Sequence, residues 1–238
     1  MSAVKNRLIL ALDFPSIHMA QSFALGSIGR VGAYKVGPVM FLAEGPKVIG
    51  WLQDKCGGGI FLDLKFHDIP NTVAGTVSRI SHLNVDMFTV HSLGGTKMVK
   101  AARDTAAEGA EKLNLPRPKV VAVTVLTSHD EEEAKKLFGA TDTVSAVLRL
   151  AEAAEKGGAD GLVCSGNEIE PLKKEFGDRF KLIVPGVRLP GADVGDQKRT
   201  VTPKEAIEKG ADFLVIGRTI TQSDDPVKTL DEIAASIA

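Results

Sequence analysis

The sequence predicts a (βα)8 TIM barrel that occupies the whole chain, residues 1–238, as a single domain. Three observations favour this fold. The length lies near the roughly 250 residues that such barrels usually need, eight short apolar runs alternate with longer amphipathic segments, and no linker interrupts them. The near-continuous hydrophobicity of the runs is typical of parallel strands that are covered on both faces. An open, doubly wound sheet is the alternative that this alternation leaves.

The expected strands are β-branched or apolar runs at residues 8–14, 33–39, 60–66, 87–92, 120–127, 161–166, 182–187 and 213–219. Between them, residues 96–113 and 143–156 carry apolar side chains at helical spacing. Glycines after a last helical turn, such as Gly157, predict helix ends. The pairs Thr202-Pro203 and Asp225-Pro226 predict helix starts.

Composition and charge limit the possible partners. The chain carries 29 Lys and Arg residues against 30 Asp and Glu, without a dense basic stripe, so we expect no nucleic-acid or membrane partner. Cys56 and Cys164 stand alone, which predicts neither a disulfide framework nor a zinc site. The first apolar run is too short for a signal peptide or a membrane span. Together these features predict a cytoplasmic protein.

Polar residues near the strand ends are the candidates for chemistry, because active sites of such barrels lie at the carboxyl ends of the strands. Asp63 and Lys65 are two positions apart in an expected strand, so their side chains are predicted to share the inner face. By itself the pair has two interpretations, a structural ion pair or a catalytic one. Lys35 and Asp68 are expected to extend it into an alternating array, which favours the charged form of Lys65 and suits proton delivery.

Two glycine–arginine segments predict a phosphate site. Pro185-Gly186-Val187-Arg188 follows the seventh expected strand and Gly217-Arg218 the eighth, where barrels of this kind commonly bind phosphate. Glycine lets backbone N–H groups approach the anion, and arginine offers two parallel donors. Either segment alone is also compatible with a tight turn beside a surface arginine. Residues 188–201 form an unusually long connection, which is either a functional lid or a disordered segment, and its Gly, Pro and Asp content favours a lid.

Other polar positions near the strand ends are less specific. Asp13 either holds a ribose hydroxyl or caps a helix. Thr127 and Ser128 either contact the polar edge of a base or cap the helix that follows. His91 is expected to be a hydrogen-bonded structural group, because no second histidine lies at metal-ligand spacing. We therefore predict no metal site.

The motifs are recognisable in their order along the chain. They are Leu10-Ala11-Leu12-Asp13, Tyr34-Lys35-Val36-Gly37, Asp63-Leu64-Lys65-Phe66-His67-Asp68-Ile69-Pro70-Asn71-Thr72, Val123-Thr124-Val125-Leu126-Thr127-Ser128, Pro185-Gly186-Val187-Arg188, Gly195-Asp196-Gln197 and Val215-Ile216-Gly217-Arg218. Through them, nearly the whole chain resembles the orotidine 5′-phosphate decarboxylase family, specifically its shorter bacterial type. The long DxKxxDxPNT segment is the most specific part. Thr219 departs from the resemblance, because many relatives carry proline there.

The resemblance implies decarboxylation of orotidine 5′-monophosphate to uridine 5′-monophosphate in pyrimidine biosynthesis, without a cofactor. It makes Lys65 the proton donor to C6 of the pyrimidine and sets Asp63 against the substrate carboxylate. Lys35 and Asp68 complete the charged array. It further implies a homodimer in which Asp68 and Thr72 reach the neighbouring subunit's site. The remaining implied contacts are Asp13 with the ribose, Thr127 and Ser128 with the base, and Pro185, Arg188, Gln197, Gly217 and Arg218 around the phosphate.

Two other functions are compatible with parts of this pattern. A sugar-phosphate decarboxylase or aldolase of the same superfamily keeps DxKxxD but uses Mg²⁺. The Ile69-Pro70-Asn71-Thr72 continuation and Gln197 favour the nucleotide enzyme instead. A non-catalytic sensor of phosphorylated ligands would keep the anion site. The set of Asp63, Lys65 and Asp68 argues against a sensor, because binding alone needs no buried charge array.

Overall fold

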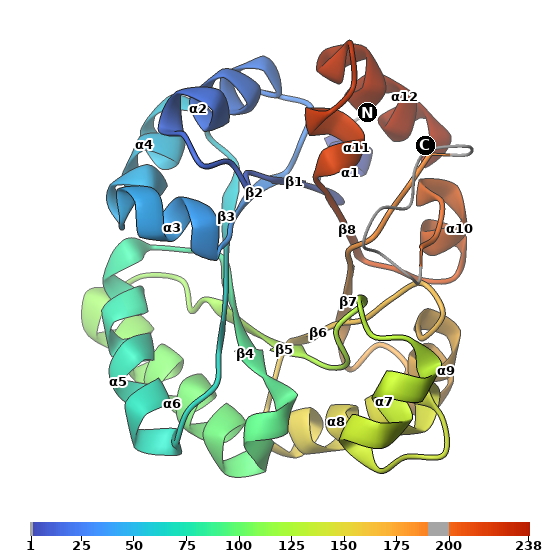
Figure 1. The fold of residues 1–238 in the computed structure, drawn as a ribbon. Helices are drawn as coiled ribbons and strands as arrows, with labels where there is room; N and C mark the ends of the chain where they lie inside the picture. The colour runs from blue at the N-terminus through green and yellow to red at the C-terminus, as the bar shows by residue number, and fades with distance from the viewer. Residues whose placement is uncertain (1, 190–199) are drawn as a thin grey trace.

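The structure, a computed structural model, describes residues 2–189 and 200–238 (Figure 1). Eight parallel strands follow one another around a closed barrel: β1 (Leu8–Ala11), β2 (Ala33–Val36), β3 (Gly59–Phe66), β4 (Met87–His91), β5 (Lys119–Val123), β6 (Gly161–Val163), β7 (Lys181–Val184) and β8 (Phe213–Ile216). The barrel closes where Leu8 of β1 pairs with Leu214 of β8. This closure confirms the predicted (βα)8 barrel and rules out the open sheet.

Helices surround the barrel and cover the outer face of its sheet (Figure 1). The described ones are α1 (Ser2–Lys5), α2 (Ile17–Gly26), α3 (Pro38–Glu44), α4 (Lys47–Lys55), α5 (Pro70–Ile80), α6 (Gly95–Leu113), α7 (Glu131–Phe138), α8 (Thr143–Lys156), α9 (Ile169–Phe176), α10 (Pro203–Glu208), α11 (Arg218–Thr221) and α12 (Pro226–Ser236), with 3₁₀ turns η1 (Ser81–Leu83) and η2 (Ser92–Gly94). Within the described ranges, no helix is long and apolar enough to cross a membrane.

The predicted helix starts are confirmed by their capping contacts. Thr202 and Glu205 form a capping box at the start of α10. The Asp225 carboxylate accepts a hydrogen bond from the Lys228 amide at the start of α12. Both helices carry proline in the first turn, where the missing N–H has no helical partner to lose.

The predicted strands are in the right places, but most of them end sooner than expected. β1 ends at Ala11 rather than at residue 14, and β5 ends at Val123 rather than at residue 127. The apolar run continues because the following loops are themselves buried, as at Leu12 and Val125. The apolar runs therefore indicate which residues are buried, including those of the loops, and do not indicate where each strand ends. Asp13, which was expected in the first strand, lies on a loop.

Two hydrophobic cores support the barrel. The larger one lies between strands and helices, and the smaller one fills the interior with Ile9, Ala11, Ala33, Phe61, Met87, Val121, Ile183 and Val215. Because strand side chains alternate between faces, the residue two positions beyond an interior residue points inward as well. In β2 and β3 these next residues are Lys35 and Asp63, and Asp13 lies on the loop that follows β1. The fold thus places these charged side chains next to the apolar side chains that fill the barrel interior.

Candidate active site

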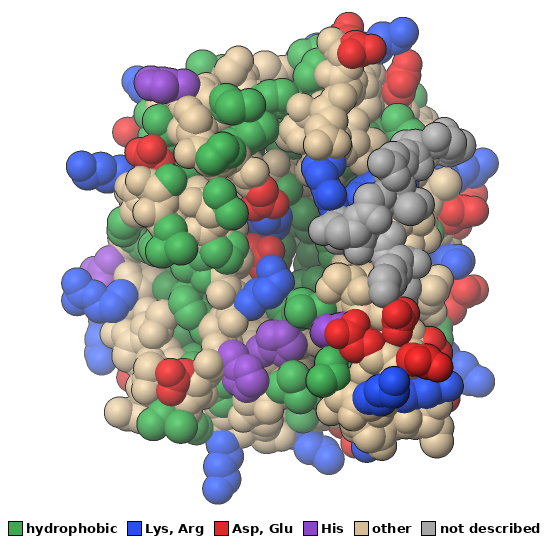
Figure 2. All heavy atoms as spheres, in the orientation of Figure 1, with side chains coloured by type: hydrophobic (Ala, Val, Ile, Leu, Met, Phe, Trp, Pro, Cys, Tyr) green, Lys and Arg blue, Asp and Glu red, His purple; other side chains and the backbone are tan. Residues whose placement is uncertain are grey.

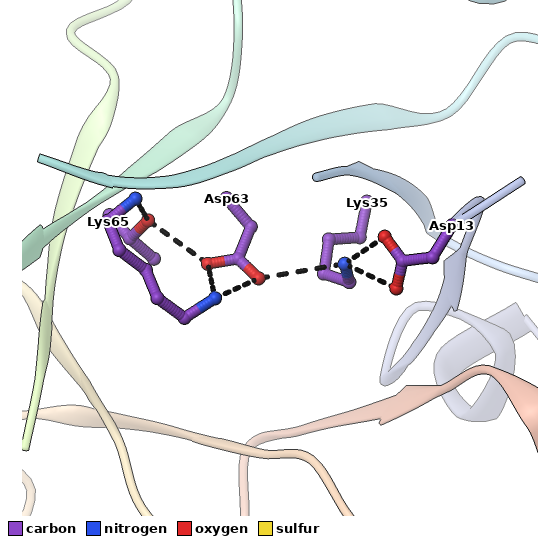
Figure 3. Close-up of polar contacts among 5 residues, drawn as sticks. Asp13, Lys35, Asp63 and Lys65 are labelled. Carbon is purple, nitrogen blue, oxygen red and sulfur yellow. Dashed lines mark hydrogen bonds and ion pairs between the residues drawn. The ribbon is translucent and has the colours of Figure 1, made fainter. Parts of the chain in front are cut away.

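Four charged side chains form a continuous chain across the barrel mouth (Figure 3). The Lys35 ammonium donates to both oxygens of Asp13, at 2.8 and 2.9 Å, and its Nζ lies 3.6 Å from Oδ2 of Asp63. The Lys65 ammonium donates to both oxygens of Asp63 at 2.9 Å. The signs therefore alternate in the order Asp13, Lys35, Asp63, Lys65.

Asp63 is the most tightly enclosed carboxylate of this array, and its residue is 8% exposed. Burial raises the pKa of the carboxyl group, but the positive charges of Lys35 and Lys65 together outweigh it, helped by hydrogen bonds from Lys65 and Thr89. The net effect holds the pKa of Asp63 below its usual value. A buried, ionised carboxylate thus lies between two ammonium groups.

Lys65 reaches this position through an irregular backbone. Its φ is 51°, in the left-handed region that residues with a Cβ rarely adopt. The pairing of β3 with β4 shifts register between Leu62 and Phe66. The alternation predicted from the sequence is confirmed for Asp63, which lies inside, and for Leu62, which belongs to the outer core. Lys65 belongs to β3 and lines the same cleft as Asp63, as predicted, but it does so through a bulge-like irregularity that the sequence did not indicate.

Asp68 does not join the array within one chain. It lies just after β3, it is exposed, and its carboxylate accepts a hydrogen bond of 2.6 Å from the amide of Ile69. The second carboxylate of the array is Asp13, which lies at the opposite end, beside Lys35. Thr72, in the first turn of α5, is exposed as well. Their expected contribution to a neighbouring subunit stays a prediction.

A cleft with two lobes opens above the array, and charged side chains are visible in the central hollow of this face (Figure 2). The first lobe, about 420 Å³, is lined by Ala11, Asp13, Phe14, Lys35, Pro185, Gly186, Arg188, Val215, Gly217, Arg218 and Thr221. The second, about 290 Å³, is lined by Asp13, Lys35, Phe61, Asp63, Lys65, Val123, Val125, Leu126, Thr127, Ser128, Val163, Ile183, Pro185 and Val215. We call them the arginine lobe and the lysine lobe. Their shared wall includes Asp13 and Lys35.

The two lobes bring together most of the predicted site residues. Both arginines of the predicted phosphate site line the arginine lobe, whereas Thr127 and Ser128 line the lysine lobe. Gln197 lies outside the described residues, as does most of the predicted lid, residues 188–201.

Contacts at the ends of β7 and β8 join the two arginine-bearing segments. Gly186 has a φ of 75°, which glycine adopts without strain. The carbonyl oxygen of Val187 accepts hydrogen bonds from the Thr219 hydroxyl at 3.0 Å and from Nη1 of Arg188 at 2.9 Å. Thr219, the position that departs from the family pattern, therefore connects the segment after β8 to the segment after β7.

Two residues of the site were not found from the sequence. Thr89 contacts both Asp63 and Lys65, and its position two residues after the interior Met87 would have indicated an inward-facing hydroxyl. Gly37 makes room for the first ion pair, because a Cβ there would lie 2.5 Å from Oδ1 of Asp13. Its nearness to Lys35 in the sequence was the available signal.

His91 at the end of β4 lies in a cluster of positive or titratable groups. Burial, followed by the nearby His67, Lys65 and His129, lowers the pKa of His91 to about 4. Its Nδ1 is buried and has no hydrogen-bond partner among the residues described, so the hydrogen bond expected there is not found. Within residues 2–189 and 200–238, no group of three or more His, Cys, Asp or Glu side chains could hold a metal ion.

Comparison with known proteins identifies the family. A family model described as orotidine 5′-phosphate decarboxylase / HUMPS family matches residues 6–233, which include the whole array and both lobes. The chain belongs to this family. The orotidine 5′-phosphate decarboxylases of Moorella thermoacetica and Pseudoalteromonas translucida are 43% and 44% identical to it, over 98% of this chain and over 92% and 97% of their own lengths.

The solved structures agree with the family assignment. Orotidine 5′-phosphate decarboxylase from Lactobacillus acidophilus has a TM-score of 0.83 and 35% sequence identity, over 98% of this chain and 99% of that one. The resemblance to the orotidine 5′-phosphate decarboxylase family that the motifs indicated is thereby confirmed.

Proposed function

We propose that this chain decarboxylates orotidine 5′-monophosphate to uridine 5′-monophosphate. The observation that carries the proposal is the ionised Asp63 carboxylate between the ammonium groups of Lys35 and Lys65 at the base of the cleft. Membership of the family supports the same reaction. The reaction belongs to pyrimidine biosynthesis, and we propose the cytoplasm as its location, since Cys56 and Cys164 are free thiols.

The cleft suits a nucleotide monophosphate. In this proposal, the phosphate lies in the arginine lobe against Arg188, Gly217 and Arg218. The pyrimidine lies in the lysine lobe beside Thr127 and Ser128. The ribose then lies at the shared wall, where Asp13, half of whose side chain is exposed, still has free surface to accept hydrogen bonds from its hydroxyls.

Loss of CO₂ leaves a carbanion at C6, and the chain offers Lys65 to stabilise and protonate it. Repulsion between Asp63 and a substrate carboxylate about 4 Å away amounts to about 4 kcal/mol at an effective dielectric near 20. Enzymes usually lower barriers by roughly 8–23 kcal/mol, so this repulsion alone is insufficient. We assign the larger share to the Lys65 ammonium, which Asp63 holds in place before the charge develops.

We also propose that two chains form a homodimer through the face that carries the site. Hydrophobic side chains are exposed just beyond β2, β3 and β4, at Val39, Leu42, Ile69 and Leu93, and Leu42 is 85% exposed. Hydrophobic side chains gather over α2 and α3 in Figure 2. Exposed apolar patches of this kind are typical of association surfaces. Asp68 and Thr72 belong to the same region and would enter the partner's site.

The ultraviolet absorbance change of orotidine 5′-monophosphate measures the proposed reaction directly. We expect turnover that EDTA does not reduce. Loss of activity with EDTA would favour a Mg²⁺-dependent sugar-phosphate enzyme, and nucleotide binding without turnover would favour a sensor. Lys65→Ala is expected to lower turnover by more than about 10³-fold and still bind uridine 5′-monophosphate measurably. Lys100→Ala, at an exposed position of α6, is the control and should retain wild-type turnover.

A further inference from the structure

We propose that Thr89 is a positioning residue, which holds the Asp63 carboxylate and the backbone of Lys65 in their reactive arrangement. Thr89 lies in the middle of β4 and is completely buried. It contacts the charged array but lines neither lobe of the cleft, and no role in the reaction follows from the motifs that identify the family. The inference rests on the proposed decarboxylation.

A single hydroxyl group makes both contacts. Its oxygen accepts a hydrogen bond of 2.8 Å from the Lys65 amide, and its proton is donated to Oδ1 of Asp63 at 3.1 Å. The direction of both bonds is fixed, because an amide can only donate and an ionised carboxylate can only accept. Thr89 therefore couples the backbone of one member of the pair to the side chain of the other.

The Lys65 contact explains how an unfavourable backbone conformation persists. The register shift in β3 removes the regular pairing between Leu62 and Phe66, and Lys65 adopts its φ of 51° within this interval. A buried N–H without an acceptor is destabilising, and the Thr89 hydroxyl supplies the acceptor. Residues in such conformations persist where the surroundings hold them, and they cluster at active sites.

The Asp63 contact fixes the plane of the carboxylate. Oδ1 accepts from Thr89 and Lys65, whereas Oδ2 faces Lys65 and Lys35. Without the hydroxyl, the carboxylate loses its only uncharged donor among these contacts and is free to rotate toward the ammonium groups. Because the same loss releases the Lys65 backbone, the ammonium no longer points into the lysine lobe at the required position. Small misplacements of this kind lower rates strongly.

The test compares variants that keep or remove the hydroxyl. Thr89→Val keeps the shape and is expected to lower kcat by about 10- to 100-fold. The Kd for uridine 5′-monophosphate should change much less. Thr89→Ser keeps the hydroxyl and should restore most of kcat. Thr124→Val is the matched control, because Thr124 is also completely buried and donates its hydroxyl to a neighbouring strand, at Val163, without touching the array.

A pH profile separates positioning from general loosening of the barrel. The Thr89 hydrogen bond helps to lower the pKa of Asp63. In Thr89→Val the acid limb of kcat/KM should therefore move to higher pH, whereas in Thr124→Val it should stay in place. A wild-type kcat in Thr89→Val would overturn the proposal. So would a Thr124→Val variant that loses as much kcat and shows the same shift in the acid limb of kcat/KM. If Thr89→Val fails to fold, Thr89→Ala removes the same hydroxyl without adding a methyl group.

A crystal structure of the Thr89→Val or Thr89→Ala protein tests the inference independently of the reaction. We expect Lys65 to leave the left-handed region and its ammonium to move away from Asp63. An unchanged Lys65 backbone would contradict the positioning role even if the chain acts on another substrate. Conversely, absence of orotidine 5′-monophosphate turnover in the wild type would refute the proposed function and leave this structural result to stand alone.

Discussion

Asp63 determines the electrostatics of the site at the scale of single residues. An ionised carboxylate with little access to water is unstable unless cations or donors compensate it. Lys35, Lys65 and Thr89 provide that compensation. Since the folded state lowers the pKa of Asp63, these contacts stabilise the fold above the unfolded pKa near 3.9, and the stabilisation is lost as the pH falls further, through the folded value.

His91 produces a second pH dependence in a different range. Its folded pKa of about 4 lies below the unfolded value of 6.5, so the unfolded chain binds a proton first as the pH falls. The free energy of unfolding should therefore decrease between about pH 6.5 and pH 4, by at most about 1.4 kcal/mol per pH unit. Most of this pH range lies above the pH range in which protonation of Asp63 affects stability.

Replacement of His91 by glutamine tests this dependence. We expect urea unfolding of His91→Gln to depend less steeply on pH between 6.5 and 4 than that of the wild type. His18→Gln is the control, because His18 is exposed on α2, and it should keep the wild-type slope. Identical slopes in His91→Gln and the wild type would show that His91 is not responsible.

At the scale of elements, β3 shows both the reach and the limit of sequence reasoning. The apolar run and the inward position of Asp63 follow from hydropathy and alternation. The left-handed Lys65 does not, because no local propensity of lysine indicates it and the register shift depends on pairing with β4. Alternation could have placed the Thr89 hydroxyl inside the barrel, but not its contacts with Asp63 and Lys65, which lie on another strand. Asp68 was expected in the array, but within one chain its exposed carboxylate accepts a hydrogen bond from the Ile69 amide instead.

The ends of β7 and β8 act as one unit at the arginine lobe. Arg188 and Arg218 line the lobe, and the hydrogen bond from Thr219 to Val187 joins the segments that carry them. A phosphate bound there would contact both segments. Its binding energy would then support chemistry in the neighbouring lysine lobe, as contacts away from the reacting atoms do in many enzymes.

Arg188→Ala should therefore impair the enzyme only for phosphorylated substrates. We expect kcat/KM for orotidine 5′-monophosphate to fall by about 10- to 100-fold, as for loss of a charged hydrogen bond, whereas the rate with orotidine should hardly change. Arg30→Ala is the control, because it removes an exposed arginine that pairs with Asp231 elsewhere. Equal losses with both substrates would refute the phosphate role of Arg188.

At the scale of the whole molecule, the barrel and the site were predicted to different depths. Eight apolar runs predicted a parallel sheet, because burial on both faces leaves a strong pattern in sequence. The pairing of β1 with β8 in the structure was needed to distinguish the closed barrel from an open sheet. The array of Asp13, Lys35, Asp63 and Lys65 was predicted in part, with Asp13 assigned to the ribose rather than to Lys35. Contacts between chains leave no periodic signal in one sequence, so the expectation that Asp68 reaches a neighbouring subunit's site rested on the family resemblance.

Mixed dimers test whether two chains build each site. If Asp68 serves the partner's site, Lys65→Ala and Asp68→Ala homodimers are both impaired. In a mixed dimer one site lacks both residues and the other retains both. An equal mixture that exchanges subunits should then recover about a quarter of the wild-type activity, because half of the dimers are mixed and each carries one intact site.

Recovery of activity in the mixed dimers distinguishes a site built by two chains from a dimer whose chains each build their own site. If Asp68 acts within its own chain, every site in a mixed dimer lacks one residue and activity stays low. Leu42→Glu, which places a charge on the most exposed apolar side chain of the patch, should prevent the recovery and yield monomers in sedimentation experiments. A fully active Leu42→Glu monomer would contradict both the interface and the shared site.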